Sequence, residues 1–226
     1  TLGYANGPVR CSQIDDAEIA QRGQQFPFDD AVYQFGNVDI TTAVISEILA
    51  TVDEYFTETQ PGYVAPKLVM YAGHNPPACA GEPAPFPVAY CPDDNTVSYQ
   101  LAELKRIGTA TGGWSSANGD FSALVLLVSR YALAAMHAGN ASIEGGNAGL
   151  QALCYAGTWA NWMRTPHGDY QLSPNDLDKA IYEIISSPVA ASDVTGDTNA
   201  PIIDRVQALG YGVTTTISEC FNAYYQ

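Results

Sequence analysis

Apolar side chains recur every three or four residues in the segment that follows Asp39, and this spacing predicts an amphipathic α-helix. The apolar positions of this predicted face are Ile45, Ile48, Leu49, Val52 and Phe56. Asp39 is the predicted N-cap, because its short acidic side chain can accept a hydrogen bond from the first turn. Pro61 and Gly62 predict the end of the helix.

Short apolar runs between turn residues predict a small β-sheet. Val88–Cys91 and Thr96–Tyr99 flank the polar segment 92–95, Pro-Asp-Asp-Asn, whose composition is typical of a turn. An earlier run, Lys67–Tyr71, predicts a further strand, and the Pro- and Gly-rich segment 73–87 separates it from the other two. The sheet is therefore expected to be small and to lie in the first half of the chain.

The rest of the chain has the pattern of helices. Residues Phe121 to His137 are almost all apolar, so this predicted helix has no polar face and is expected inside the fold. A short helix is predicted at 101–107, followed by a loop at 108–118, and a longer helix is predicted at 148–163. The next predicted helix is opened by Ser173 as its cap and Pro174 in its first turn. A last short helix is predicted at 204–209, before a Thr-rich tail.

These elements predict an α+β fold, mostly helical with a small sheet. Residues 1–37 mix Gly, Pro and polar residues without a sustained period, and we interpret them as an amino-terminal arm. Residues 38–226 are expected to form one domain, because a chain of 226 residues can bury one substantial core.

Composition excludes some classes of partner. The net charge of −15 argues against nucleic acid and against anionic membrane surfaces, both of which attract Lys and Arg. No apolar run reaches the roughly 18–20 residues that span a bilayer, since Ser129 and Arg130 interrupt the longest one. The chain begins with Thr1, so we expect a mature or trimmed form, with a lipid anchor upstream left open.

Five cysteines, at positions 11, 79, 91, 154 and 220, indicate an oxidising compartment. Spacing does not decide the connectivity, because even four cysteines allow three pairings. Cys11 lies in the polar arm, and both a free thiol and a bond to a partner chain remain open for it.

Several isolated features are candidates for metal, Ca²⁺ or glycosylation sites. The three histidines, His74, His137 and His167, lack the spacing of metal ligands and are predicted to lie at the surface. The oxygen-rich segment 193–199 lacks the spacing of an EF-hand, so we interpret it as a solvated loop rather than a Ca²⁺ site. Asn140, in Asn-Ala-Ser, fits a glycosylation acceptor, which is a frequent chance pattern.

Scattered motifs, taken together, resemble the neutral zinc metallopeptidase family over about residues 40–222. Before the predicted central helix the matches are Pro-Lys-Leu-Val at 66–69, Tyr-Cys-Pro at 90–92 and Gly-Asp-Phe at 119–121. After it, the segment 149–160, Gly-Leu-Gln-Ala-Leu-Cys-Tyr-Ala-Gly-Thr-Trp-Ala, is similar to a family segment that contains Glu-Leu-Gln-Ala-Asp-Cys. The resemblance continues at 172–180 and at Cys220.

The departures from the family all fall on its chemistry. In the family the central helix carries His-Glu-x-x-His, where two histidines bind zinc and the glutamate activates water. The resemblance implies that Ser129, Arg130 and Leu133 occupy these three positions. It also implies that Gly149 stands in place of the third ligand, and Leu153 in place of the aspartate four residues on.

The resemblance implies a zincin-like fold without the zinc site. It favours the disulfides Cys79–Cys91 and Cys154–Cys220. It implies no cofactor, no metal and no catalytic residue. Ser129, Leu133, Gly149 and Leu153 are then filler for a vacated cavity, whereas a buried Arg130 requires a carboxylate partner or a solvated cleft.

The expected function is that of an inactive peptidase homologue. It would be secreted or associated with the cell envelope, and would bind or scaffold another protein there. Exposed aromatic residues, among them Tyr224 and Tyr225, are expected to mark such an interface. Two alternatives remain open: a hydrolase that uses a non-standard site or a metal elsewhere, and a binder of acidic small ligands that uses Arg130 in a remodelled cleft.

Overall fold

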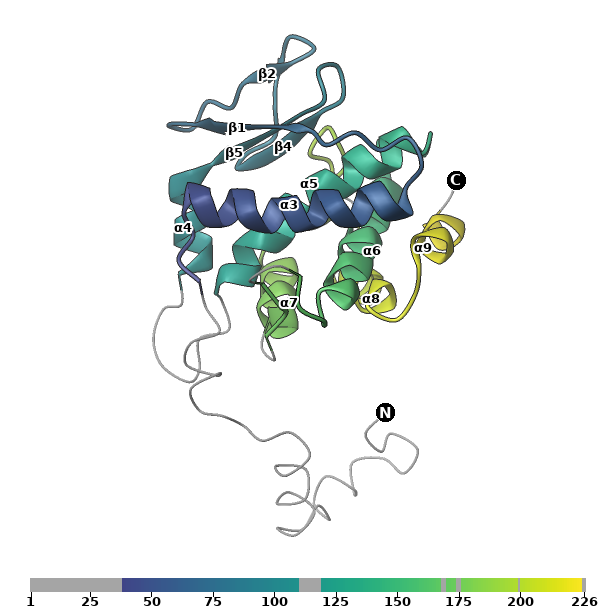
Figure 1. Cartoon of the computed structure of the whole chain (residues 1–226). Coiled ribbons are helices and arrows are strands. Elements are labelled where there is room, and N and C mark those ends of the chain that lie inside the picture. Colours follow the sequence, from purple (N-terminus) through teal and green to yellow (C-terminus); the bar gives the residue numbers. More distant parts are fainter. Residues whose placement is uncertain (1–37, 110–118, 168–169, 174–175, 199, 225–226) are drawn as a thin grey trace. The chain divides into compact units, whose positions relative to one another are not determined.

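The computed structural model describes residues 38–109, 119–167, 170–173, 176–198 and 200–224. The chain divides into two units, Thr1–Gly36 and Asn37–Gln226, and the described residues all belong to the second unit. The predicted arm at 1–37 and Cys11 lie outside the described residues. The second unit is α+β and mostly helical, with a small sheet on one side of its helices (Figure 1).

The first described helix, α3, spans Thr42–Thr59 and buries the predicted apolar face. The prediction of Asp39 as its cap was wrong. Thr41 is the N-cap, and its hydroxyl accepts a hydrogen bond from the backbone N–H of Val44 at 3.2 Å. The helix ends as expected before Pro61 and Gly62, where Gly62 has a φ of 82° that favours glycine.

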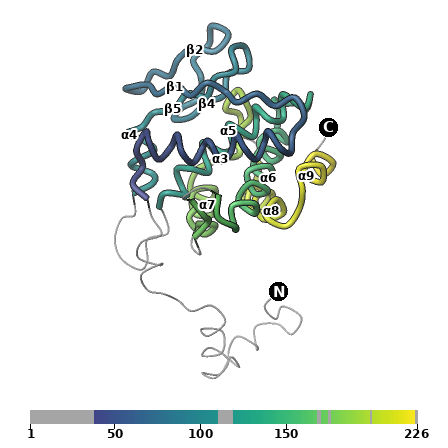
Figure 2. The backbone as a smooth tube through the Cα atoms, viewed as in Figure 1, coloured from purple at the N-terminus to yellow at the C-terminus, as the bar shows by residue number. Residues whose placement is uncertain are grey.

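The sheet has three strands in the order β1-β5-β4. β1 (Lys67–Tyr71) pairs in parallel with β5 (Thr96–Gln100), and β4 (Val88–Cys91) pairs antiparallel with β5 on its other side. The predicted turn at 92–95 joins β4 to β5, as Figure 2 lets the reader follow. A two-stranded hairpin of β2 (Ala78–Cys79) and β3 (Glu82–Pro83), which the sequence did not predict, is tied to β4 by the Cys79–Cys91 disulfide.

The helix α5 (Asp120–Ala138) forms the centre of the unit. It contacts β4 and β5 of the sheet, α4 (Leu101–Gly108), and the helices α6 and α7 described below. By length and composition alone α5 could cross a membrane. However, 89% of its most apolar 18-residue stretch is buried inside the fold. The prediction of a core helix is therefore confirmed.

The helices α6 (Gly146–Trp162) and α8 (Ile202–Gly212) approach each other backbone to backbone. A Cβ atom built on Gly157 of α6 would lie 2.4 Å from the carbonyl oxygen of Leu209 and 2.9 Å from Cα of Gly212. One built on Gly212 would lie 2.0 Å from the carbonyl oxygen of Cys154. Both contacts are too short for a side chain, so this crossing requires glycine on each helix.

Gly157→Ala is therefore expected to lower the free energy of unfolding by about 2–3 kcal/mol, because the added methyl group forces the two helices apart. Gly210→Ala is the matched control, since a Cβ at this helical position meets no atom within 4 Å. It is expected to raise stability by about 0.5–1 kcal/mol. Urea unfolding of both variants checks this, and equal effects would contradict the close approach.

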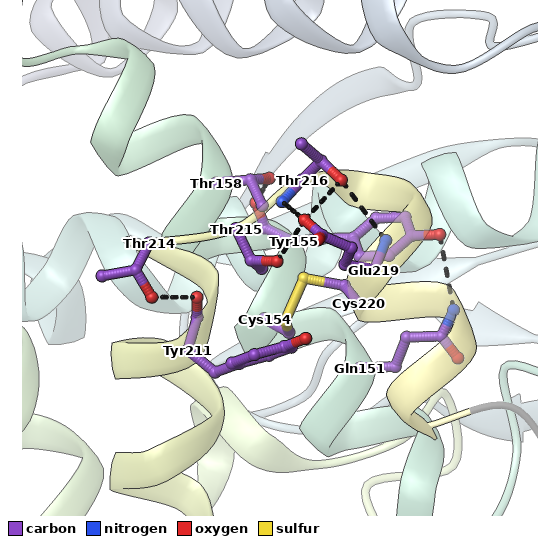
Figure 3. Close-up of a disulfide and its surroundings, with 10 residues drawn as sticks. All are labelled: Gln151, Cys154, Tyr155, Thr158, Tyr211, Thr214, Thr215, Thr216, Glu219 and Cys220. Carbon is purple, nitrogen blue, oxygen red and sulfur yellow. Dashed lines mark hydrogen bonds between the residues drawn. A yellow bond between two sulfur atoms is a disulfide. The ribbon is translucent and has the colours of Figure 1, made fainter.

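Three further elements, α7, η2 and α9, complete the described secondary structure. α7 (Asp176–Ser186) begins two residues after Pro174, which lies outside the described residues, and the 3₁₀ turn η2 (Val189–Ala191) follows it. A last helix, α9 (Ile217–Tyr224), replaces the tail predicted after residue 209. The Cys154–Cys220 disulfide joins α9 to α6, and Figure 3 shows the hydrogen-bonded side chains around it. Both disulfides implied by the resemblance are thus present.

Candidate functional site

Residues from two of the sequence motifs, Gly-Asp-Phe at 119–121 and the segment 172–180, lie together at the amino-terminal end of α5. Lys179 Nζ of α7 donates to Asp120 Oδ1 at 2.9 Å and to Asp176 Oδ1 at 2.8 Å, and all three side chains are buried. Asp120 also accepts from the backbone N–H of Val38 at 2.9 Å and from that of Phe121 at 2.8 Å. Two motifs more than 50 residues apart therefore meet in one ion cluster.

This cluster has a structural role. Burial by itself would lower the pKa of Lys179, but the nearby carboxylates of Asp176 and Asp120 outweigh it and raise the pKa overall. The lysine therefore stays charged at neutral pH. Ser122 adds a further link, because its hydroxyl donates to the carbonyl oxygen of Lys179 at 2.9 Å. The cluster fixes α7 against the start of α5.

Arg130 lies in the middle of α5 and is 0% exposed. Its guanidinium donates to the segment that contains η2: to the carbonyl oxygens of Val189 at 3.1 Å, Ser192 at 2.8 Å and Asp193 at 3.2 Å. It also donates to the hydroxyls of Ser192 at 3.0 Å and Ser129 at 3.3 Å. The arginine thus holds the main chain of 189–193 against the central helix.

The prediction of a carboxylate partner or a solvated cleft for Arg130 needs correction. Its hydrogen-bond partners are carbonyl and hydroxyl oxygens, and its side chain has no contact with solvent. Burial lowers the pKa of Arg130 to about 10, and the charge of Asp193 opposes this lowering without forming a direct ion pair. The guanidinium remains charged at neutral pH and is satisfied by its own chain.

Gly149 of α6 contacts the same segment. A Cβ atom at this position would lie 1.7 Å from the carbonyl oxygen of Ala191 and 3.1 Å from the carbonyl carbon of Ser192. No residue with a side chain fits there while η2 keeps its place. Arg130 and Gly149, which are predicted to replace parts of one zinc site, therefore both contact the segment 189–193.

The other three positions of the predicted former site are packed into the core. Leu133 and Leu153 are each 0% exposed and belong to the main hydrophobic cluster. Ser129 is also buried, and its hydroxyl donates to the carbonyl oxygen of Leu126 at 2.7 Å. These side chains are buried in the core, and their role as filler for a vacated metal cavity stays a prediction.

The loop that follows η2 contacts the segment before α6 and the segment before β4. Val194 N–H donates to the carbonyl oxygen of Ile143 at 3.0 Å, and a Cβ on Gly196 would lie 2.9 Å from Pro85, just before β4. Asp193 is 2% exposed, so the interpretation of 193–199 as a simple solvated loop was wrong at its first residue. The Asp193 carboxylate accepts from the backbone N–H groups of Gly145, Thr195 and Asp197 and from the Thr195 hydroxyl, at 2.8–2.9 Å.

Potential metal ligands are sparse in the part of the chain that the structure describes. One group of three lies within 4.8 Å, Cys79, Cys91 and Asp93, but both sulfurs form the disulfide. His74 and His137 are exposed, as predicted. His167 is half-buried against Trp162, with ring centroids 3.2 Å apart.

A half-buried acid, Asp53, lies on α3. Tyr63 donates its hydroxyl proton to Asp53 at 2.6 Å. Burial raises the pKa of Asp53 to about 6, although this hydrogen bond opposes the rise. Burial is the largest cause of the raised pKa values of Tyr63 and Tyr131, and the negative charge of Asp53 raises both further.

The raised pKa of Asp53 predicts a pH dependence. The folded protein binds a proton more tightly here than the unfolded chain, so the contribution of this group to stability falls as pH rises from about 4 to about 6. Asp53→Asn is expected to remove this dependence and to be more stable than the parent above pH 6 by about 1–2 kcal/mol. This value is reduced because solvent reaches part of the group. Urea unfolding between pH 4 and 7 measures it, and parallel profiles would contradict it.

A pocket that no sequence pattern indicated lies beside the hydrogen bonds of Ser129 and Arg130. Its volume is about 350 Å³, and it lies between α4, α7, η2 and the segment before β4. Leu126 and Val189 line it, and their carbonyl oxygens accept from Ser129 and Arg130. Its polar side chains include Glu103, Arg106 and Glu183, which lie far apart in the sequence.

Comparisons with protein families, curated proteins and solved structures give no match to this chain.

Proposed function

We propose that this protein is a catalytically inactive relative of the neutral zinc metallopeptidases that binds or scaffolds another protein. In this proposal the fold is a zincin-like frame whose metal site has been replaced by packing. No metal and no cofactor takes part. The partner is a secreted or envelope protein rather than nucleic acid, because the net charge is −15.

One observation carries the proposal: the segment 189–193 is held by Arg130 and requires Gly149. A zincin site needs imidazole and carboxylate ligands around an open position for water. At the positions that the motifs align with those ligands, this chain has a buried cation, two leucines, a serine and a glycine. A carbonyl of the main chain takes the space that a side chain at position 149 would need.

The ion cluster supports the same proposal. Asp120 and Asp176, which belong to the motifs that resemble the family, both contact Lys179 and join α5 to α7. These motif residues thus hold the frame together, whereas the positions aligned with chemistry have changed. The two disulfides are consistent with an extracytoplasmic protein.

The alternative that Arg130 binds an acidic ligand is not favoured, because its donors are directed at the main chain of 189–193 and its side chain is buried. A hydrolase with a non-standard site is likewise not proposed. None of the residues discussed above pairs a nucleophile with a base within hydrogen-bond reach in an open pocket.

The proposal is tested by incubating the protein with a mixed peptide library, with and without added zinc and with and without a chelator. We expect no cleavage under any condition. Chelator-sensitive cleavage would contradict the inactive state. For the binding function, chemical cross-linking in culture medium or envelope extract should give one partner in near-stoichiometric amount, and recovery of the uncross-linked chain alone would contradict it.

A further inference from the structure

The pocket beside η2 combines acidic and aromatic side chains in a small volume. Its walls include Phe86 before β4, Glu103 and Arg106 of α4, Leu126 of α5, and Tyr182 and Glu183 of α7. Its volume of about 350 Å³ lies near the lower end of the range for ligand pockets, about 300–1,000 Å³. The space therefore suits one side chain or a small group better than a large cofactor.

Glu183 is the deep polar group of this pocket. Its residue is only 7% exposed although it lines the pocket. Burial raises the pKa of its carboxyl above the usual value, while the charge of Arg106 and a hydrogen bond with the Ser187 side chain oppose the rise. Burying a carboxylate is unfavourable unless a positive charge or donors approach it. An approaching cation would therefore be stabilised more strongly here than at an exposed glutamate.

Glu103 and Arg106 form an ion pair at the outer side of the pocket. Arg106 donates through Nε to Glu103 Oε2 at 2.9 Å and through Nη2 to Glu103 Oε1 at 2.5 Å, in the parallel geometry that guanidinium and carboxylate groups favour. The Arg106 side chain is 69% exposed, whereas that of Glu103 is 21% exposed. The cation is therefore the more exposed member of this pair.

Two exposed aromatic rings complete the lining. Phe86 is 36% exposed and Tyr182 is 43% exposed, and they come from different elements of the pocket. The flat faces of such rings attract guanidinium and ammonium groups, and arginine side chains are found there more often than lysine side chains. Aromatic faces next to carboxylates are thus a combination that recognises a cation.

We propose that this pocket binds an arginine side chain presented by an exposed segment of a partner protein. The guanidinium approaches Glu183 in the depth of the pocket, and its methylene groups pack between Phe86 and Tyr182. Arg106 occupies the acidic mouth in the free protein and moves from Glu103 when the partner arginine enters. The inference rests on the proposed function in one respect, that the ligand belongs to a protein.

The charge of the chain favours the same class of ligand. With a net charge of −15, the field around the protein attracts basic segments and repels acidic ones. Among the described residues that line the pocket, Arg106 is the one positively charged partner for an acidic ligand, and Glu103 and Glu183 would repel such a ligand. The pocket therefore selects for positive charge even though it contains one arginine.

The test uses the full chain and the probe peptide acetyl-Gly-Arg-Gly-amide, followed by ¹H–¹⁵N chemical shifts at pH 7 and low salt. Peptides with lysine, citrulline or glutamate in the central position are the comparisons. We expect saturable shifts around the pocket with the arginine peptide and weaker ones with lysine. Citrulline, which has nearly the same shape without the charge, is expected to bind at least tenfold more weakly, and glutamate not at all.

Three substitutions sharpen the result. Glu183→Gln is expected to weaken binding of the arginine peptide at least tenfold, and Arg106→Gln is expected to preserve or tighten binding because it frees Glu103. Glu58→Gln on α3 is exposed and makes the same change in net charge as Glu183→Gln elsewhere on the unit, so it is expected to change affinity less than twofold. If Glu183→Gln does not fold, Glu103→Gln takes its place, with an expected loss of at least threefold.

The inference is overturned if citrulline binds as well as arginine, if Glu183→Gln or its substitute leaves the affinity unchanged, or if Arg106→Gln abolishes binding. Preference for the glutamate peptide would show that Arg106 recognises an anion instead. These outcomes are distinguishable from failure of the proposed function, because that failure shows as chelator-sensitive cleavage and does not depend on this pocket.

Discussion

Replacing Arg130 by alanine is expected to lower the free energy of unfolding by about 3–5 kcal/mol. The substitution removes the guanidinium donors from the carbonyl oxygens of Val189, Ser192 and Asp193. The oxygens of Val189 and Asp193 keep hydrogen bonds from the backbone N–H groups of Ser192 and Gly196. It also opens a cavity beside the central helix, because Arg130 is among the largest fully buried side chains. Urea unfolding gives the free energy, and hydrogen exchange at residues 191–194 should accelerate most.

Two controls separate this effect from a general loss of charge. Arg164→Ala removes an exposed arginine and is expected to change stability by less than about 0.5 kcal/mol. Arg130→Lys keeps the charge but has fewer donors than the guanidinium, so it should fall between the parent and the alanine variant. A loss below about 1 kcal/mol for Arg130→Ala would show that the segment 189–193 does not depend on this side chain.

Removing the Cys154–Cys220 disulfide by the double substitution Cys154→Ala and Cys220→Ala is expected to lower stability by about 4 kcal/mol. The bond closes a loop with a sequence separation of 66 and ties α9 to α6. In the chain-entropy description, a longer closed loop restricts the unfolded chain more. The Cys79–Cys91 bond, with a separation of 12, is expected to contribute less, about 3 kcal/mol.

Urea unfolding of both double-alanine variants, in the absence of reductant, measures the two contributions. Proteolysis adds a local readout, because cleavage after loss of Cys154–Cys220 should begin near α9. A larger loss from Cys79–Cys91 than from Cys154–Cys220 would contradict the ranking, and would indicate that the β2–β3 hairpin matters more for stability than the last helix.

Patterns within one element predicted much of the fold. The apolar stretch at 121–137 marked α5 because it has no polar face, and the turn residues at 92–95 marked the β4–β5 hairpin. α9 was missed because the Thr-rich segment before it resembles an extended tail. The signal was present: Thr216 and Glu219 form a capping box, in which Glu219 N–H donates to the Thr216 hydroxyl and Thr216 N–H donates to the Glu219 carboxylate.

The candidate sites depended on contacts between distant residues, and no local pattern contains these. Arg130 meets Val189 and Ser192 across about 60 positions of sequence, so its partners were predicted only as a class, and the class was wrong. Gly149 was expected to be filler, but it is required by the close approach of Ala191. Glu103 and Glu183 line one pocket from two helices, and nothing in either segment indicated it.

We propose above all that packing of the segment 189–193 has replaced a zinc site. The most direct test of this proposal is the zinc content of protein refolded in the presence of zinc and then dialysed against metal-free buffer, measured by elemental analysis. The account predicts far less than one zinc per chain, both for the parent and for Arg130→Lys. One tightly held zinc per parent chain, lost on substitution of residues within 129–153, would contradict it.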